Sequence, residues 1–275
     1  MKTKVNILMV ALSLIASTVS YAKTAINGLC YELNNKTLEA TVVSLNEFNN
    51  DSEENYKETS FVVPAEITYD NKTYKVTAIE IGAFAVCSNL TSITLPNTIK
   101  HIGSSAFSGC KKLAFVTLPN SIKRIEPETF GGCESLKSIT IPEGVTTIAQ
   151  YSIDVPSSIE SITLPSTLKF ISPEAFFGVT SIKSVIVKSP TLIALYKNSF
   201  PVFGNLYVPK GSKEAYEKAA IWQNFNIIEG EPTGIENLQA TLDSQPSPIF
   251  TLSGQRISTP RKGLVIIKGK KVVVK

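Results

Sequence analysis

Histidine and aspartate, on which many enzymes and metal sites depend, are nearly missing from this chain. Its 275 residues include one histidine, His101, and four aspartates spread along the sequence. A Ser-His-Asp triad would have to form around His101, and a zinc site needs several closely spaced cysteines or histidines. The sequence has no Gly-rich phosphate loop and no Gly-x-Ser-x-Gly elbow. We therefore expect that the protein is not an enzyme, and we expect no metal and no cofactor.

A strong charge of one sign is missing as well. The formal net charge is +4, and residues 249–275 contain seven Lys or Arg and no acid. Residues 23–248 carry 18 basic and 23 acidic groups, which is a net charge of −5. A nucleic-acid partner would need a basic stripe along the chain, so none is expected. The basic end could touch anionic lipid or lipopolysaccharide, or it could be a solvated segment.

Only one hydrophobic run is long enough to suggest a membrane segment, and it lies at the N-terminus. Lys2 and Lys4 precede the apolar run Val5–Val19, and the small residue Ala22 follows. This order is typical of a secretory signal peptide, here residues 1–22. A retained membrane anchor is the alternative, although the run is short for a bilayer span. We expect export to the outer cell surface or the extracellular space, with no membrane span after cleavage.

What the sequence does contain is an internal repeat of 23 residues. One column of the repeat is aromatic in four of its five copies: Phe84, Phe107, Phe130, Ile153 and Phe176. Other apolar columns keep the same interval: Ile79, Ile102, Ile125, Ile148 and Ile171, then Leu90, Leu113, Leu136, Ile159 and Ile182, then Ile93, Val116, Ile139, Ile162 and Val185. A fixed period of this size indicates a solenoid, in which each repeat is one turn of a coil.

Each turn is expected to contain two short strands. The segment Leu90–Leu95 is rich in β-branched residues and alternates in its second half. Pro96 ends it because proline cannot donate to a strand ladder, and a second extended piece covers Ile99–Ile102. Equivalent strands of successive turns must pair in parallel, about 4.8 Å apart. The predicted fold is a mainly β repeat solenoid with 23-residue turns, a parallel strand face and capped ends.

Two copies of the repeat are close enough to be compared with a known family: IKHIGSSAFSGCKKLAFVTLPNS at 99–121 and IKRIEPETFGGCESLKSITIPEG at 122–144. They resemble the BspA-type leucine-rich repeats of bacterial surface proteins, and the resemblance extends over roughly residues 60–230. It implies a right-handed leucine-rich repeat solenoid in a cell-surface or secreted binding protein. We expect five repeats and a degenerate turn over residues 76–204. The fourth turn departs from the pattern, since it lacks both the aromatic residue and the cysteine.

Three of the four cysteines, Cys87, Cys110 and Cys133, occupy one column of the repeat. An even count in an exported protein suggests disulfides. However, Pro156 and Val179 occupy the same column in later turns. We therefore expect a stack of small buried thiols, with disulfides as the alternative. Cys30 lies outside the array, and we expect it to be unpaired or buried.

The N-terminal end of the array is expected to carry a cap, because the first turn would otherwise expose its core and its strand edge. Residues 23–75 do not follow the period and form this predicted β cap. Within it, Asp70–Lys72 lies between two alternating runs and predicts a hairpin turn. The polar stretch 46–59 is expected to be a long loop, either merely solvated or functional.

The C-terminal end, residues 205–230, is predicted to be a strand-helix cap. It begins with a strand over Leu206–Val208. A helix is expected over Lys213–Trp222, because Ala215, Ala219 and Trp222 follow helical spacing and Ser212 is a good N-cap residue. Trp222 could be a ligand platform, but we expect it to pack in the core.

The composition changes again after Gly230. Residues 231–248 are polar and contain prolines, so they are predicted to be a linker. Residues 249–275 form short strands separated by turns. Through Leu252–Val265 and the closing Gly269–Lys275, this block resembles the C-terminal secretion or sorting module of exported Bacteroidetes proteins. The resemblance implies an address or attachment signal.

The exposed side of the strand face is the candidate functional surface. Its predicted contact positions are Thr94, Phe115, Thr117, Lys137, Thr140, Glu160, Thr163 and Lys183. The four threonines are expected to stack as a hydroxyl ladder. Phe115 is the best candidate contact residue, because serine occupies its position in the four other turns. A strand face that is soluble and has no ligand is the alternative.

Together these patterns predict a secreted or surface-displayed binding protein without catalytic activity. We expect a monomer that attaches to a protein of a host, a matrix or another cell. Capture of a glycan and a structural role in the cell envelope are the alternatives. Few aromatic side chains are predicted to face outward, which favours a protein ligand over a glycan.

Overall fold

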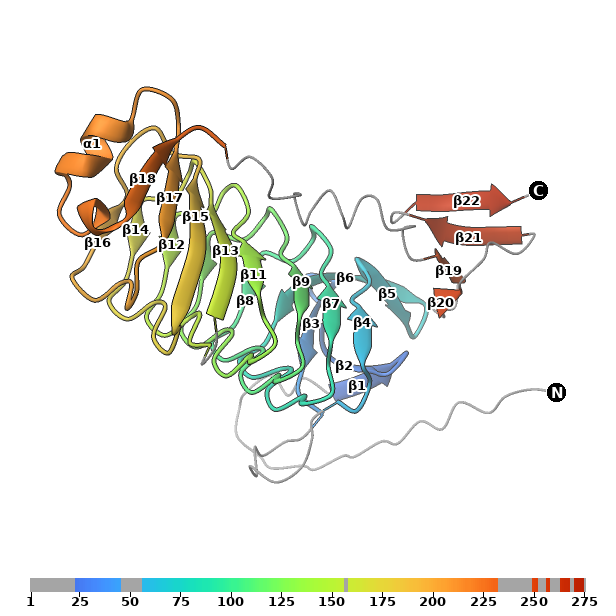
Figure 1. Ribbon diagram of the computed structural model, residues 1–275. Helices are drawn as coiled ribbons and strands as arrows, with labels where there is room; N and C mark the ends of the chain where they lie inside the picture. The colour runs from blue at the N-terminus through green and yellow to red at the C-terminus, as the bar shows by residue number, and fades with distance from the viewer. Residues whose placement is uncertain are drawn as a thin grey trace. The chain divides into compact units, whose positions relative to one another are not determined.

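The computed structural model describes residues 23–45, 56–155 and 158–231, and the strand segments 249–251, 256–257, 263–267 and 270–274 (Figure 1). The chain divides into two compact units, Met1–Glu231 and Pro232–Lys275. The predicted signal peptide, the predicted linker and most of the loop expected over 46–59 lie outside the described residues. Within the described part, no helix reaches the length and hydrophobicity needed to cross a bilayer.

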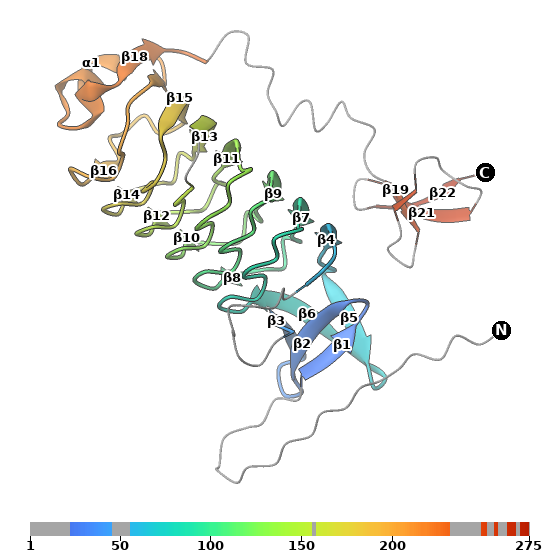
Figure 2. The ribbon, with the colours of Figure 1, turned by 60° about the horizontal axis from the view of Figure 1, so that its bottom comes forward.

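The first unit is a coil whose turns each contribute one strand to a front ladder and one to a back ladder. The front strands of the repeats are β7 (Ser92–Thr94), β9 (Phe115–Thr117), β11 (Ser138–Thr140), β13 (Ser158–Leu164), β15 (Ser181–Val187) and β17 (Asn205–Val208). The back strands are β8 (His101–Ile102), β10 (Arg124–Ile125), β12 (Thr147–Ile148), β14 (Phe170–Ile171) and β16 (Ala194–Leu195). Figure 2 shows the two ladders along opposite edges of the coil. Paired strands run parallel, and most pairs join residues 23 apart, as in Ile139 with Ile162. The predicted β solenoid is confirmed.

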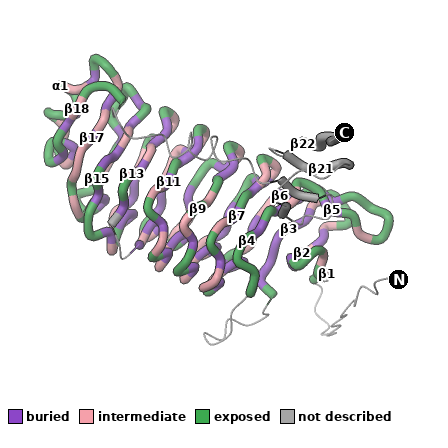
Figure 3. Tube along the Cα trace, turned by 45° about the vertical axis from the view of Figure 1, so that its right-hand side comes forward, coloured by how far each residue is buried: buried purple, intermediate pink, exposed green. Residues whose placement is uncertain are grey.

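The interior of the coil is filled by the apolar columns of the repeat. Figure 3 shows buried segments alternating with exposed ones along every turn. The rings of Phe84 and Phe107 stack with centroids 5.5 Å apart, and those of Phe107 and Phe130 with centroids 5.6 Å apart. Ile153 is buried in the same column. Phe176 continues it by stacking on Phe200 at 4.6 Å.

Phe200 was not included in the predicted column, because the back ladder advances by 24 residues, and not 23, between β14 and β16. Back strand β16 pairs with β14 through Phe170 and Ala194, which are 24 residues apart. The front ladder advances by only 21 residues at the same turn, since β15 pairs with β17 through Ser184 and Asn205. The last turn therefore departs from the 23-residue spacing on both ladders, where the sequence predicted a degenerate turn.

One position in each turn takes a left-handed backbone conformation, although most turns place a residue with a side chain there. The φ angle is 63° at Gly82 and 55° at Ser105, Glu128, Tyr151 and Glu174. Left-handed conformations cost an ordinary residue about 1–2 kcal/mol. The recurrence in four residue types shows that the coil geometry imposes this conformation at the bend after each back strand.

Both ladders are interrupted at the turn that contains Phe115. In the described part of the chain, the front ladder consists of β4-β7-β9 and, separately, β11-β13-β15-β17-β18. The back ladder joins β8 to β6, and joins β10 to β12, β14 and β16. The predicted four-threonine ladder therefore rests on two separate strand pairings, and its continuity across the break stays a prediction. Thr94 pairs with Thr117, and Thr140 pairs with Thr163, but no strand pairing joins Thr117 to Thr140.

The N-terminal end is a β sheet that continues into the back ladder. It contains β1 (Lys23–Ile26), β2 (Leu29–Asn34), β3 (Glu39–Val43), β5 (Glu66–Tyr69) and β6 (Lys72–Ile79), in the order β1-β2-β3-β6-β5. The predicted hairpin turn is confirmed, with Asp70 and Asn71 at φ 48° and 57°. A further strand, β4 (Ser60–Val62), pairs with β7 and starts the front ladder.

The C-terminal end differs from the predicted cap. Helix α1 covers only Lys213–Lys218, because Ala219 takes an extended conformation (φ −85°, ψ 129°). Trp222 lies in the separate 3₁₀ turn η1 (Trp222–Asn224), which Ile221 precedes with φ 75°. Ser212 precedes α1, but its side chain makes no capping hydrogen bond. Tyr216, rather than Ala215, is the buried residue of the helix. The last front strand, β18 (Asn226–Glu229), pairs in parallel with β17 and was not predicted.

Trp222 is a core residue, as expected. Its side chain is buried, and its indole Nε1 donates a hydrogen bond to the backbone oxygen of Ile193 at 3.0 Å. Its ring also lies near Phe200 and Phe225, with centroids 5.9 and 5.8 Å away. The tryptophan therefore closes the column of stacked rings at the C-terminal end of the array.

The expected stack of buried thiols is confirmed. All four cysteines are buried. The thiol of Cys110 donates to the backbone oxygen of Phe84 at 3.1 Å, and that of Cys133 to Phe107 at 3.3 Å. Burial raises the pKa of Cys133 from 9.0 to about 12. The pKa of Cys110 is also raised, by hydrogen bonding with Cys87 and by burial.

These thiols are expected to resist alkylation in the native protein at about pH 8 and to react fully after unfolding, since the thiolate is the reactive form. Because their folded pKa values lie above the unfolded value, their contribution to stability is complete below pH 9.0 and is lost as the pH rises from there towards about 12. Mass spectrometry after iodoacetamide treatment, with and without guanidinium chloride, measures the first effect. Denaturant titrations across this pH range measure the second. Rapid labelling of Cys110 or Cys133 in the native state would contradict the prediction.

The second unit is a small antiparallel sheet. It contains β19 (Ile249–Thr251), β20 (Arg256–Ile257), β21 (Gly263–Ile267) and β22 (Lys270–Val274), in the order β20-β19-β21-β22. The β21–β22 pairing joins Gly263 to Val274 and Ile267 to Lys270. The predicted short strands are confirmed, and the role of this unit as a sorting module stays a prediction.

Candidate functional site

The outer side of the front ladder carries the predicted contact residues. Seven of them are exposed, and the eighth, Thr163, is half-buried. In β9, Phe115 and Thr117 lie directly beside Ser92 and Thr94 of β7. In a strand, successive side chains point to opposite faces, so these residues share the face opposite the buried Ile93. The structure thus places Thr94, Phe115 and Thr117 on one face. The break between β9 and β11 separates them from Thr140 and Thr163, and Lys137, Glu160 and Lys183 are exposed residues of this second group.

The charged residues of this face form a column over three turns. Lys137, Glu160 and Lys183 recur at the 23-residue interval. The Nζ atom of Lys183 lies 3.5 Å from an Oε1 atom of Glu160, and both side chains are exposed. Exposed ion pairs of this kind contribute little to stability. This column is therefore polar surface that is available for contact with a ligand.

Phe115 is the most unusual residue of the face. Its side chain is 51% exposed. The next residue, Val116, is only partly buried, although its counterparts Ile93 and Ile139 are buried in the core. Strand β9 is thus less deeply packed than its neighbours, and it is also the strand at which the front ladder ends. The large apolar ring of Phe115 stands on a small-residue, hydroxyl-rich surface beside this break.

The serine position of the front face, which Phe115 occupies in β9, is poorly accessible in the other turns. Ser184 occupies the same register as Ser161 and is buried, with its hydroxyl donating to the backbone oxygen of Glu160 at 3.2 Å. Ser138 and Ser161 are half-buried. At this position the face is therefore exposed only where Phe115 replaces serine, whereas the neighbouring charged residues Lys137, Glu160 and Lys183 are exposed.

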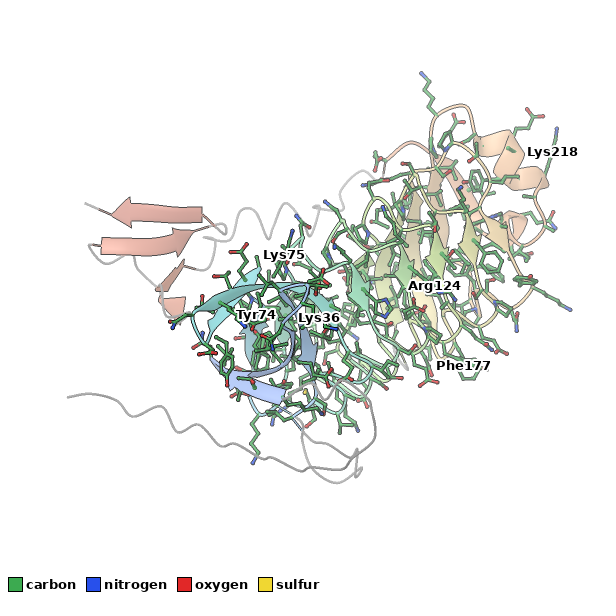
Figure 4. All side chains as sticks on the ribbon, turned by 180° about the vertical axis from the view of Figure 1, so that it is seen from behind. Lys36, Tyr74, Lys75, Arg124, Phe177 and Lys218 are labelled. Atoms are coloured by element: carbon green, nitrogen blue, oxygen red, sulfur yellow. The ribbon has the colours of Figure 1, made fainter. Side chains whose placement is uncertain are left out.

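A second group of exposed side chains lies on the back of the array and was not predicted. Phe177 and Tyr196 are each 52% exposed. Phe177 packs edge-to-face on Tyr151, and Tyr196 packs edge-to-face on Phe170. Figure 4, the view from behind, labels Phe177 on this side of the coil. These residues lie in columns that vary from turn to turn, so the repeat pattern did not indicate their exposure.

Charged groups with altered pKa values do not assemble into a catalytic centre in the described part of the chain. Burial raises the pKa of Glu80 in the first turn and that of Asp154 in the fourth. His101 is exposed in β8. No group of three or more His, Cys, Asp or Glu side chains with the geometry of a metal site occurs among the described residues. The arrangement offers extended surfaces for binding.

The family comparison fits this geometry. Residues 77–203 match the model of the BspA type leucine-rich repeat region in six copies. This segment is a BspA-type leucine-rich repeat array. Comparison with curated proteins gives no match.

Several solved structures are similar to the chain that carries the BspA-type array. The leucine-rich repeat protein TpLRR of T. pallidum is 28% identical, over 60% of this chain and 71% of that one, with a TM-score of 0.48. A leucine-rich repeat protein from Bacteroides capillosus is 30% identical, over 45% and 84%, with a TM-score of 0.38. The pneumococcal vaccine antigen PcpA is 18% identical, over 76% and 48%, with a TM-score of 0.56. The chain spans about half the length of PcpA, and this likeness supports the fold alone.

Proposed function

We propose that the protein is a non-catalytic binding protein, exported to the outer cell surface or the extracellular space, that attaches to another protein through the front face of its BspA-type array. BspA-type repeats are typical of surface and secreted proteins, which supports the location. The proposal that the ligand is a protein rests on the exposure of Phe115 on a hydroxyl-rich face. The strand module at the C-terminus would then serve for sorting or attachment.

The surroundings of Phe115 suit a protein ligand. Binding energy at protein interfaces is concentrated in a few large side chains, commonly aromatic, surrounded by contacts that exclude water. Phe115 is flanked by Ser92 and Thr117, and the column of Lys137, Glu160 and Lys183 adds charges of both signs. An apolar side chain surrounded by polar and charged residues of both signs is the arrangement found in transient protein interfaces.

Phe115→Ser is expected to weaken binding to a protein ligand by at least about tenfold, which corresponds to about 1.4 kcal/mol. Serine is the residue that the other turns carry at this position, so the fold should be unaffected. The measurement is a set of binding isotherms for the purified chain on an array of immobilised matrix proteins, including fibronectin, fibrinogen, laminin and collagen.

The matched control is Phe177→Ser, which removes a ring of nearly equal exposure from the back of the array. It is expected to leave protein binding unchanged. Saturable binding that is insensitive to Phe115→Ser would refute the role of the front face. Absence of saturable binding on the whole array would favour a structural role in the cell envelope.

A further inference from the structure

The back of the fourth to sixth turns carries a polar column that is held together across the turns. Gln150, Glu174 and Asn198 follow each other at intervals of 24 residues. The side-chain amide of Gln150 donates to one carboxylate oxygen of Glu174 at 2.9 Å. The amide of Asn198 donates to the other oxygen at 3.2 Å. One polar side chain from each of three successive turns is thus fixed in a continuous row.

Aromatic rings border this row on both sides. Tyr151 follows Gln150 in the chain and packs edge-to-face on Phe177, with ring centroids 5.6 Å apart. Tyr196 packs in the same manner on Phe170, at 5.4 Å. In each pair one ring supports the other, and the outer ring, Phe177 or Tyr196, is half exposed. Such paired rings present apolar faces to solvent in fixed orientations.

The charges around the row are balanced. The back strands and bends of these three turns, residues 147–155, 169–178 and 193–200, contain two acids, Asp154 and Glu174, and two lysines, Lys169 and Lys197. Their net charge is zero. Hydrogen bonds from Tyr151, Gln150 and Asn198 lower the pKa of Glu174, so its carboxylate stays ionised as an acceptor. The surface therefore has strong local hydrogen-bonding groups without a field that would attract a polyanion or a polycation.

We propose that this row and its two aromatic pairs form a binding site for an uncharged polysaccharide. Sugar rings combine hydroxyl groups with apolar C–H faces, and the surface offers a counterpart to each. The amide of Asn198 uses one N–H on Glu174, which leaves its other N–H and its oxygen for sugar hydroxyls. The amide of Gln150 is also hydrogen-bonded to Tyr151, and its oxygen is left for a sugar hydroxyl. Phe177 and Tyr196 provide faces on which the C–H sides of sugar rings can pack.

The repeat spacing fits a chain ligand that lies along the array. Successive turns are about 4.8 Å apart, which is comparable to the length that one sugar unit adds to an extended polysaccharide. A glycan parallel to the coil axis would therefore meet one polar group of the row per sugar unit. The site is separate from the front face, because the two strand ladders lie along opposite edges of the coil (Figure 2).

The test uses the purified chain and binding isotherms on beads coupled to dextran, laminarin, galactomannan or xylan, with heparin beads and uncoupled beads for comparison. Saturable binding to at least one neutral polysaccharide is expected. The double variant Phe177→Ser with Tyr196→Ser is expected to weaken it by at least about tenfold. Phe115→Ser, a ring of equal exposure on the front face, is the matched control and is expected to leave the affinity unchanged.

Thermal unfolding of each variant shows whether the fold is retained, and loss of a half-exposed ring should shift the midpoint little. The proposal is overturned if no neutral polysaccharide binds, if only heparin binds, or if the double variant binds as well as the native chain. It is also overturned if the double variant still binds the polysaccharide but no longer binds a protein that the native chain binds on the array of matrix proteins. Failure of the polysaccharide test leaves the Phe115 experiment unaffected, because the two sites share no residue.

Discussion

Replacing Phe107 by alanine is expected to lower the free energy of unfolding by about 3–5 kcal/mol. The ring is fully buried and lies nearly parallel to those of Phe84 and Phe130, at interplanar angles of 13° and 8°. Its removal opens a void that is shared by three successive turns. The turns cannot close on it, because hydrogen bonds such as that from Phe107 N to Thr129 O (3.0 Å) fix their separation. We therefore expect a loss near the upper end of the range.

Urea unfolding followed by circular dichroism measures this loss, and Trp222 fluorescence reports the C-terminal end of the array separately. Phe115→Ala is the control, since the same chemical change on the surface should alter the stability by no more than about 0.5 kcal/mol. If Phe107→Ala cost less than about 1 kcal/mol, the stacked column would not be the main support of the core.

Gly204→Ala is expected to destabilise the protein by about 3 kcal/mol or more, beyond the usual cost of overpacking. A Cβ atom at this position would collide with the backbone oxygen of Ile182, and it would lie 3.0 Å from the carbonyl carbon of Ile182 and 3.1 Å from the oxygen of Lys183. All three atoms belong to the backbone of the preceding turn and cannot rotate away. The substitution therefore has to separate β17 from β15, which pair through Asn205 and Ser184.

Gly131→Ala is the matched control for this experiment. A Cβ atom there would meet its nearest neighbours at 3.4 Å, one of them the rotatable side chain of Ser108. The alanine also restricts the unfolded chain, which stabilises a protein by about 0.4–1 kcal/mol where the backbone tolerates it. Equal melting temperatures for the two variants in differential scanning calorimetry would disprove the close approach of the turns at Gly204.

The coil was predictable because each apolar column has the same physical cause in every turn. No single turn can bury its own side chains, so the columns of Phe84, Cys87 and Leu90 must be apolar wherever a neighbour stacks on them. The parallel pairing and the thiol stack follow from the same argument. The outward position of the predicted contact residues follows from alternation along a strand.

The structure differs from the sequence-based expectation where a single residue or the distance between two backbones determines the local conformation. One extra residue between back strands β14 and β16 displaced Phe200 from its column, and the extended conformation of Ala219 ended the helix before Trp222. The break between β9 and β11 depends on how closely two backbones approach, which the residue types do not encode. Phe177 and Tyr196 occupy columns in which the residue type varies from turn to turn. In such columns the period does not indicate whether a side chain points outward or inward.

The interruption of both ladders at one turn determines how the array carries mechanical load. Tension along the coil passes from turn to turn through inter-strand hydrogen bonds, but β9 is joined only to the preceding front strand and β10 only to the following back strand. At this turn the two ladders are linked through the chain between Leu118 and Lys123, which carries part of the load from one side of the coil to the other. The bends add a parallel route, as in the hydrogen bond from Gly109 N to Gly131 O at 2.7 Å. The compliance of the array is therefore concentrated in one turn, the one that presents Phe115.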